Sequence, residues 1–466
     1  MKEQSHSTPE APVYATEKRE VVSIQVDLNH PLLQLKWALP WDTIQEAMIK
    51  RWKAAGKNVD GSKCGCSLDV LLWVPLVVLM IVKNLDPREM EAYLSENVVA
   101  RMFIGKTEQL SPQIRDHSRI GRNYGALGKE GIKELTKLIL LEAKQFGFAD
   151  PTILSADTTA QELPIGYPNE PGILRGLAQR CLRAFAGLKK KGEQGLDYAV
   201  EKAKTVLKSV KEHHLFAKGK EAKTEILTRL VQETTELMEQ TTQVIENVKG
   251  RSDRVKQGAI EKLESMKEVA TKLIPQILYW MKTGLVAKGK ILHAGIPKAL
   301  AIVRKKAGKK TEFGLPYLIN RIGGGYLFAE LLMSCPDESK MPLQSLVCYR
   351  EIFGKNATPK RVVYDRGGWC QTTVKKLKEQ GIEQIGILPK GKAPWLVAEE
   401  IQKQVMSERG KTEGSIGTIK SKKYGFNKPL ERNLQSLQMA GHRSVLSFNL
   451  NKLMKDIVKS NQMVQV

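Results

Sequence analysis

The chain has 466 residues, 42% of them hydrophobic, which suits about two to four globular domains with apolar cores and excludes an intrinsically disordered chain. Its 74 Lys and Arg against 50 Asp and Glu give a formal net charge of +24, and the isoelectric point is near 9.6. Such a surplus favours a polyanionic partner, above all nucleic acid, although a ribosome-associated or simply soluble basic protein has a similar balance.

Neither the start of the chain nor its most apolar run is typical of a secreted or membrane protein. Residues 1–29 are mostly polar and are expected to form a flexible leader without a secretion signal. The run 68–82 contains Asp69 and Pro75 and is shorter than the ~20 residues that cross a bilayer, so it predicts a buried core helix. The scattered cysteines are expected to be reduced thiols. Together these features predict a cytoplasmic protein with no membrane partner.

Residues 30–147 are expected to form a compact helical domain. Apolar residues at helical spacing occur in WDTIQEAMIKRW, and Asp86 with Pro87 is typical of a helix start. The next segment, SPQIRDHSRIGRNYGALG, carries the cations Arg115, Arg119 and Arg122. A helix, a turn and a basic helix are what a helix-turn-helix reader of the DNA major groove requires. The alternative is a small helical domain with ordinary solvated arginines.

Residues 148–172 and 173–300 differ sharply in pattern. TILSADTTAQELPI predicts a strand with the polar residue Asp157 at its end. This strand is expected to be the first part of an α/β core. Residues 173–300 predict an all-helical insertion, in which two heptad seams flank a charged tip at 249–258 and indicate an antiparallel helical hairpin. The seams consist of Leu230, Thr234, Leu237, Thr241, Val244 and Val248, and of Ala259, Leu263, Met266, Ala270, Leu273 and Ile277.

Residues 301–466 are expected to complete the α/β core. EFGLPYLINRIGGGYLFAELLMS predicts two strands around a triple-glycine turn, and PLQSLVCYREIFG predicts a helix. RVVYD is a short apolar strand that ends on Asp365, followed by a helix, a further strand and a helix that contains Glu413. The fold class is therefore α/β: a mixed sheet flanked by helices, with a helical N-terminal domain and a helical insertion.

Three acidic residues carry the candidate chemistry. Cleavage of a phosphodiester needs charge neutralised on the attacking and leaving oxygens, which two Mg²⁺ ions held by carboxylates provide. Asp157, Asp365 and Glu413 are the candidate ligands, because the two aspartates end strands and Glu413 lies on a helix with cations beside it. Each also has an ordinary reading: a turn cap for Asp157, a strand-end acid for Asp365, and a solvated helix charge for Glu413.

Cations near these acids are candidate DNA contacts. Arg409 precedes Glu413 by four residues and Lys420 follows it by seven, which places all three on one helix face. Tyr424 and Phe426 interleave with lysines in SKKYGFNKPLERN, a composition that favours nucleic acid. The remaining candidate contacts are Arg366, Lys390, Lys392, Lys422 and Lys423. A solvated turn is the alternative at 390–395. His293 and His442 have no partner in the sequence and are expected to be structural.

At these residues the chain resembles the DDE transposases of insertion sequences. LSADTT, VVYDRGG and ERGKTEGSIGTIKS look like the three catalytic blocks, with Arg409, Glu413 and Lys420 at the offsets of the signature Y-x2-R-x3-E-x6-K. Met406 stands at the tyrosine position, a departure from that signature. The resemblance covers most of residues 30–450, with the insertion as its weakest part.

The resemblance implies an RNase H-like catalytic core, two Mg²⁺ ions for which Mn²⁺ can substitute, and end cleavage followed by strand transfer. It further implies a prokaryotic, nucleoid-associated protein. It also implies that residues 30–147 bind the terminal inverted repeats, and that transposon ends and target DNA are the partners of a homodimer or larger synaptic complex. Trp369 is a candidate for stacking on a flipped base, with core packing as the alternative. Two other functions fit: a structure-selective nuclease on the same core, and a catalytically decayed DNA-binding protein.

Overall fold

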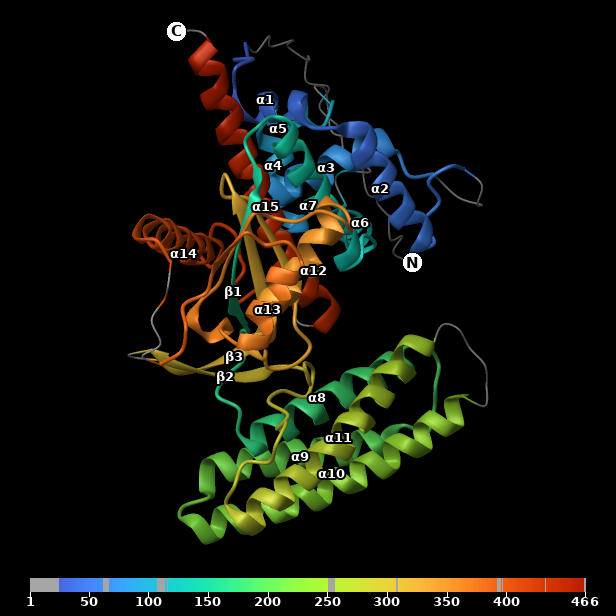
Figure 1. The fold of residues 1–466 in the computed structure, drawn as a ribbon. Coiled ribbons are helices and arrows are strands. Elements are labelled where there is room, and N and C mark those ends of the chain that lie inside the picture. Colours follow the sequence, from blue (N-terminus) through green and yellow to red (C-terminus); the bar gives the residue numbers. More distant parts are fainter. Residues whose placement is uncertain are drawn as a thin grey trace, which may run out of the picture.

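The computed structural model shows a helical N-terminal region packed on a mixed β-sheet, with a separate helical bundle extending from the sheet (Figure 1). The residues that the structure describes are 25–61, 67–106, 114, 116–249, 256–306, 309–391, 395, 397–431 and 433–464.

Within the described residues, seven helices precede the first strand. They are α1 (Pro31–Ala38), α2 (Trp41–Ala54), α3 (Val70–Lys83), α4 (Pro87–Glu96), α5 (Val98–Phe103), α6 (His117–Gly125) and α7 (Gly128–Gln145). The expected start at Asp86 is confirmed: its side chain accepts hydrogen bonds from the N–H groups of Arg88 and Glu89, and Glu89 completes a capping box. The apolar run is also confirmed as a core helix, because α3 is buried from Leu72 to Val82.

None of the described helices is by itself long and apolar enough to cross a bilayer, and α3 passes that test only together with α4, across a bend of 102°.

The sheet is mixed, as the sequence predicted. Its strands are β1 (Asp150–Glu162), β2 (Leu300–Lys306), β3 (Lys309–Gly323), β4 (Leu327–Leu331), β5 (Arg361–Val363) and β6 (Gln384–Gly386). The strand order is β2-β3-β1-β5-β6, with β4 also paired to β3. Strand β3 runs antiparallel to β1, β2 and β4, whereas β1, β5 and β6 are parallel to one another. Strand β2 starts before the expected return of strand character at residue 311.

Helices cover both faces of this sheet (Figure 1). The elements after β4 are η1 (Glu338–Lys340), α12 (Met341–Phe353), η2 (Arg366–Gly368), α13 (Gln371–Glu379), α14 (Glu399–Ile419) and α15 (Leu434–Val464). On one face, Leu154 and Leu318 join a core shared with the N-terminal helices, α12, α13 and α15. On the other, Tyr317 and Ile319 pack with residues of α14. The alternation of neighbouring residues between two cores is the ordinary period of a strand.

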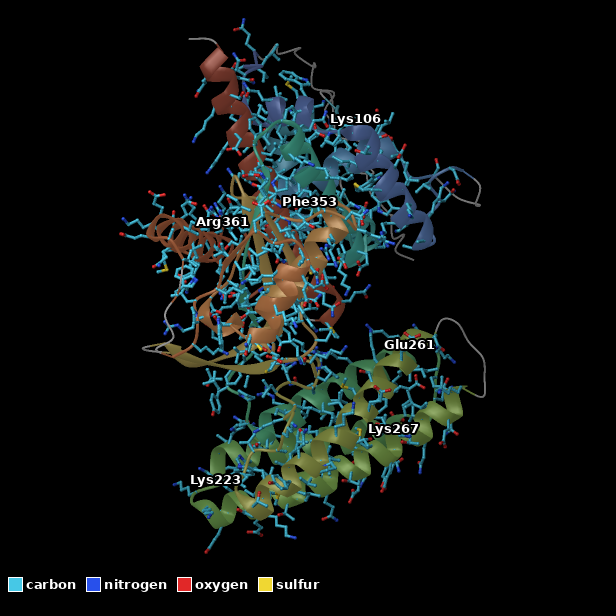
Figure 2. All side chains as sticks on the ribbon, viewed as in Figure 1. Lys106, Lys223, Glu261, Lys267, Phe353 and Arg361 are labelled. Carbon is cyan, nitrogen blue, oxygen red and sulfur yellow. The ribbon has the colours of Figure 1, made fainter. Side chains whose placement is uncertain are left out.

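The insertion is a four-helix bundle with its own core. Its helices are α8 (Glu170–Lys189), α9 (Asp197–Phe216), α10 (Lys220–Lys249) and α11 (Gln257–Thr283). Both predicted heptad seams are buried, which confirms the antiparallel pairing of α10 with α11. The hairpin does not stand alone, because α8 and α9 cover its second face. Charged residues such as Lys223, Glu261 and Lys267 project from the outside of the bundle (Figure 2).

Candidate active site

Asp157 lies on the central strand, on the face that α14 covers. The hydroxyls of Ser155 and Thr412 are hydrogen-bonded at 2.7 Å and join β1 to α14. Since alternate residues of a strand share a face, Asp157 points to the same side as Ser155. The prediction that the strand ends at Asp157 is wrong: β1 continues to Glu162, because the long strand β3 pairs with it as far as Gly314.

Asp365 follows the carboxyl end of β5, and Asp157 lies on the adjoining parallel strand β1, just beyond the part of β1 that pairs with β5. The last registered pair of β1 and β5 is Ser155 with Val363, and each aspartate is two residues beyond its member of that pair. Asp365 also caps η2 by accepting a 3.3 Å hydrogen bond from the Gly368 N–H. Carboxyl ends of parallel strands are where α/β sheets place their ligand sites. The strand-end position predicted for Asp365 is confirmed.

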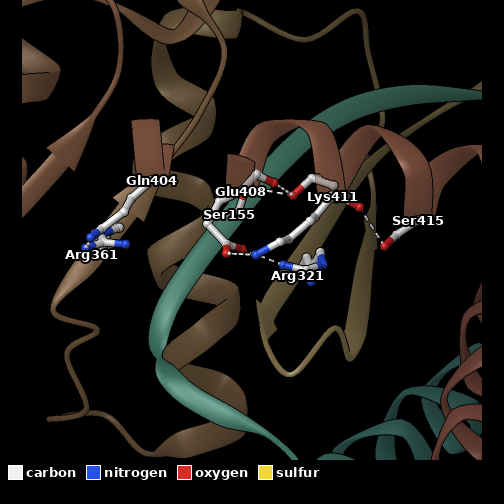
Figure 3. Close-up of polar contacts among 8 residues, drawn as sticks. Ser155, Arg321, Arg361, Gln404, Glu408, Lys411 and Ser415 are labelled. Atoms are coloured by element: carbon white, nitrogen blue, oxygen red, sulfur yellow. Dashed lines mark hydrogen bonds and ion pairs between the residues drawn. The ribbon is translucent and has the colours of Figure 1, made fainter. Parts of the chain in front are cut away.

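Helix α14 crosses β1 and presents two chemically different flanks. On the β3 side, Glu408 pairs with Arg321 at 2.6 Å and with Lys411 at 2.8 Å (Figure 3). Arg409, Glu413 and Lys420 lie on the opposite flank of the helix by helical periodicity. The Glu413 side chain is 65% exposed and lies 3.8 Å from Arg409. The predicted face of cation, acid and cation is therefore present.

A further acid, Glu338, links the strands that carry the two aspartates. Its carboxylate accepts hydrogen bonds from Thr158 Oγ1 at 2.7 Å and from Tyr364 Oη at 2.5 Å. Thr158 follows Asp157 and Tyr364 precedes Asp365, so Glu338 holds both strands directly beside their aspartates. A methyl group placed on Gly367 would lie 3.3 Å from Glu338 Cβ, which shows how closely the Asp365 loop approaches it. Sequence reasoning missed Glu338; its only signal is an acid just before a helix.

Tyr364 shows that negative charge converges here. Its ring is buried, with 1% exposed, and burial together with Glu338 raises the pKa of its phenol. The carboxylates of Asp157 and Asp365 raise this pKa further, which requires both to lie near the phenol. The donor set is entirely oxygen, as hard divalent ions prefer. Among the described residues, however, no three acids, histidines or cysteines lie close enough together to bind one ion as they stand.

The other candidate DNA contacts separate into exposed cations and buried rings. Arg366, Lys390, Lys422 and Lys423 are exposed, as a phosphate contact requires, whereas Lys392 lies outside the described residues. Tyr424 and Phe426 are buried and pack on Phe448 and Tyr317. The prediction that these two rings join the lysines in binding nucleic acid is therefore wrong, because they belong to the core. Trp369 is partly buried against the main core, which favours its packing alternative.

Cations of the N-terminal helices gather near α6. Arg119 lies over the Trp73 ring at 5.7 Å, and Arg122 is exposed beside Asp116 at 3.4 Å. Burial lowers the pKa of Lys57, and the charges of Arg122 and Arg119 lower it further, so the three form one positive patch. The third predicted arginine, Arg115, lies outside the described residues.

A cleft of about 1010 Å³ separates these N-terminal helices from the segment that follows α14. Arg88 and His117 line its N-terminal wall, and Lys420 and Lys422 line the opposite wall. Lys420 therefore belongs both to the cationic flank of α14 and to this cleft.

Comparison of the chain with protein-family models, with curated proteins and with solved structures gave no match.

Proposed function

We propose that the chain is a DNA transposase of the DDE type, with Asp157, Asp365 and Glu413 as its catalytic carboxylates and the mixed sheet as an RNase H-like core. It binds the terminal inverted repeats of its element, cleaves the DNA at their ends and joins them to target DNA. The neighbouring strand positions of the two aspartates are the observation that carries the proposal. The resemblance of the three blocks supplies the reaction.

The proposed roles follow from chemistry and position. The three carboxylates hold Mg²⁺, which neutralises charge on the attacking and leaving oxygens when it is bound. Glu413 has to approach the aspartates for this, and its exposed side chain on a helix flank has the freedom to do so. Arg409 and Lys420 hold the phosphate backbone along the same flank through charge-assisted hydrogen bonds. Glu338 is a positioning residue that fixes β1 and β5 beside the aspartates.

The positive patch of Lys57, Arg119 and Arg122 supports end binding by the N-terminal helices. The three charges lie close together, and two of them, Arg119 and Arg122, belong to the short helix α6, whose first turn is capped by Asp116. Counterion release from phosphates makes such a patch a source of affinity for any duplex. Sequence specificity would require, in addition, that side chains of α6 contact base edges in the major groove.

The experiment uses the purified full chain, linear duplexes carrying the DNA segments that flank its gene, a supercoiled plasmid and Mg²⁺. Joined products support a transposase, nicks without joining indicate a nuclease, and binding without either indicates a decayed protein. Asp365→Asn and Glu413→Gln should each lower cleavage at least about a hundredfold, because metal-held charge stabilisation is worth several kcal/mol. Binding of the ends should persist in both variants. Glu400→Gln, an exposed acid on the same helix, is the matched control.

A further inference from the structure

The helices of the insertion bundle differ in charge. Between its first and last residues, α8 carries Arg175, Arg180 and Arg183, and its only acid is Glu170 at the start, which pairs with Lys290. By contrast, α10 has six glutamates against four cations. In Figure 1, α8 borders the side of the bundle nearest the sheet, and α10 lies on the opposite side. The positive helix of the insertion therefore faces the part of the molecule that carries the candidate active site.

Two cations of α8 and the lysine that caps its carboxyl end, Lys190, lie in a row on the outer face of the helix. Arg175, Arg183 and Lys190 are exposed, opposite the buried stripe of the helix. They are eight and seven residues apart, roughly 12 and 10 Å along the axis. None of the three has an ion pair or side-chain hydrogen bond to the rest of the described chain. Three cations held in a row without internal partners are available for a ligand of repeated negative charge.

The residues between these cations indicate that the face binds a DNA phosphate backbone and not another protein. Gly172, Gln179 and Ala186 lie between them on the outer face, and the nearby Leu182 is partly buried against the bundle core. A stable protein interface needs buried aromatic or aliphatic anchors at its centre, which this face lacks. A DNA backbone needs only spaced cations and room for close approach.

The connection from the bundle to β2 packs against α8. Segment 291–299 passes over α8, where a methyl group on Gly176 would touch Ala294 at 3.8 Å, and the Arg180 guanidinium lies flat against Gly295. Burial lowers the pKa of Arg180, and the charge of Arg183 lowers it further, so the positive charges are close to each other. Docking of the helix on this connection fixes the direction of its outer face.

We propose that the outer face of α8, with Arg175, Arg183 and Lys190, binds the phosphate backbone of the duplex whose end reaches the candidate active site. This inference rests on the proposed function and assigns a role to the insertion, which the resemblance leaves without one. It makes the bundle a second DNA-binding surface beside the N-terminal helices. The contact is independent of base sequence, because it involves phosphates alone.

The test compares two triple variants of the full chain. Arg175→Gln, Arg183→Gln and Lys190→Gln together remove the α8 row, and Lys204→Gln, Lys208→Gln and Lys211→Gln remove three exposed lysines from α9 of the same bundle. Both change the net charge equally. Binding to the flanking-DNA duplexes is measured across a fourfold range of salt, with circular dichroism melting as the folding control.

The α8 variant should lose about 2.7 from the slope of log affinity against log salt, since each phosphate contact contributes about 0.9. Over the fourfold salt range, wild-type affinity should then fall about 40-fold more than that of the α8 variant. The α9 variant should keep the wild-type slope. Equal losses in both variants would mean a net-charge effect and overturn the inference.

Three further outcomes are distinguishable. An unchanged slope in the α8 variant, with wild-type cleavage intact, overturns the α8 contact and leaves the transposase proposal standing. Loss of self-association by the α8 variant in sedimentation without DNA, at unchanged DNA affinity, would assign the face to a second copy instead. Absence of DNA binding by the wild-type protein would overturn both the α8 contact and the transposase proposal.

Discussion

The hydroxyl of Thr412 and that of Ser155 are hydrogen-bonded at 2.7 Å, although 257 residues separate them in the chain. Thr412 precedes Glu413, and Ser155 is two residues before Asp157. This one contact therefore fixes the helix of the third candidate acid against the strand of the first. Both hydroxyls are buried, so the contact cannot be replaced by water without a cost.

Thr412→Val should lower the free energy of unfolding by about 1–3 kcal/mol, because it leaves the buried Ser155 hydroxyl without this partner. Urea denaturation measures the loss. Thr418→Val on the exposed side of the same helix is the matched control, since it has the same helix propensity and a hydroxyl that bonds only to its own helix. Equal stability of the two variants would mean that the Ser155 contact contributes nothing.

The ion pair of Arg321 and Glu408 holds the other flank of α14, with both residues 8% exposed. Glu408→Leu alone should cost about 3–5 kcal/mol, because a buried guanidinium loses its carboxylate. Arg321→Met combined with Glu408→Leu should recover most of that loss, since no charge then remains buried. Chemical denaturation of the two single variants and the double variant tests this, and additive losses would contradict it.

Tyr364→Phe and Glu338→Gln should both slow cleavage while leaving end binding unchanged, if Glu338 positions the two aspartates. Tyr364→Phe should also cost about 1.5–3 kcal/mol of stability, the usual contribution of a hydrogen bond to a charged group. Because Tyr364→Phe removes and Glu338→Gln weakens the same charge-assisted hydrogen bond, the double variant should be little worse than Tyr364→Phe alone. Independent, multiplying effects on cleavage in a double-mutant cycle would exclude this coupling.

His442 makes the fold sensitive to mild acid. Burial lowers the pKa of His442 to about 3, with help from Lys133 and Lys129, and the histidine packs beside Tyr317. The unfolded chain binds a proton near pH 6.5, so between pH 6.5 and 3 it takes up more protons than the folded chain. Neutral His442 thus imposes no penalty above pH 6.5, and stability falls by up to about 1.4 kcal/mol per pH unit below it.

His442→Gln should flatten this dependence between pH 6.5 and 5. Melting temperatures of the two proteins, measured in matched buffers, give the difference. An identical pH profile for wild type and variant would mean that His442 does not titrate on unfolding.

Local patterns predicted the elements that depend on neighbouring residues. The heptad seams of α10 and α11, the cap at Asp86 and the strand before Asp365 follow from short-range spacing, and the structure confirms each. The mixed sheet was also predictable, because apolar runs alternate with amphipathic ones after residue 310. The same reasoning placed Arg409, Glu413 and Lys420 on one helix flank.

The features that the sequence did not predict depend on tertiary contacts. The length of β1 beyond Asp157 depends on pairing with β3, which follows the whole insertion. Glu338 joins the site through Thr158, 180 residues earlier in the chain. Burial of Tyr424 and Phe426 depends on partners from β3 and α15, so their aromatic character suggested a surface role that their packing removes.

Strand joining by the wild-type chain and by Glu413→Gln tests the central claim most directly, with end binding measured in the same samples. We expect Mg²⁺-dependent joining of the flanking duplexes to plasmid by the wild type, loss of cleavage and joining in Glu413→Gln, and equal binding by both. Near wild-type joining by Glu413→Gln would contradict the assignment of this residue. Binding without any Mg²⁺- or Mn²⁺-dependent cleavage by the wild-type chain would contradict the proposed enzyme itself.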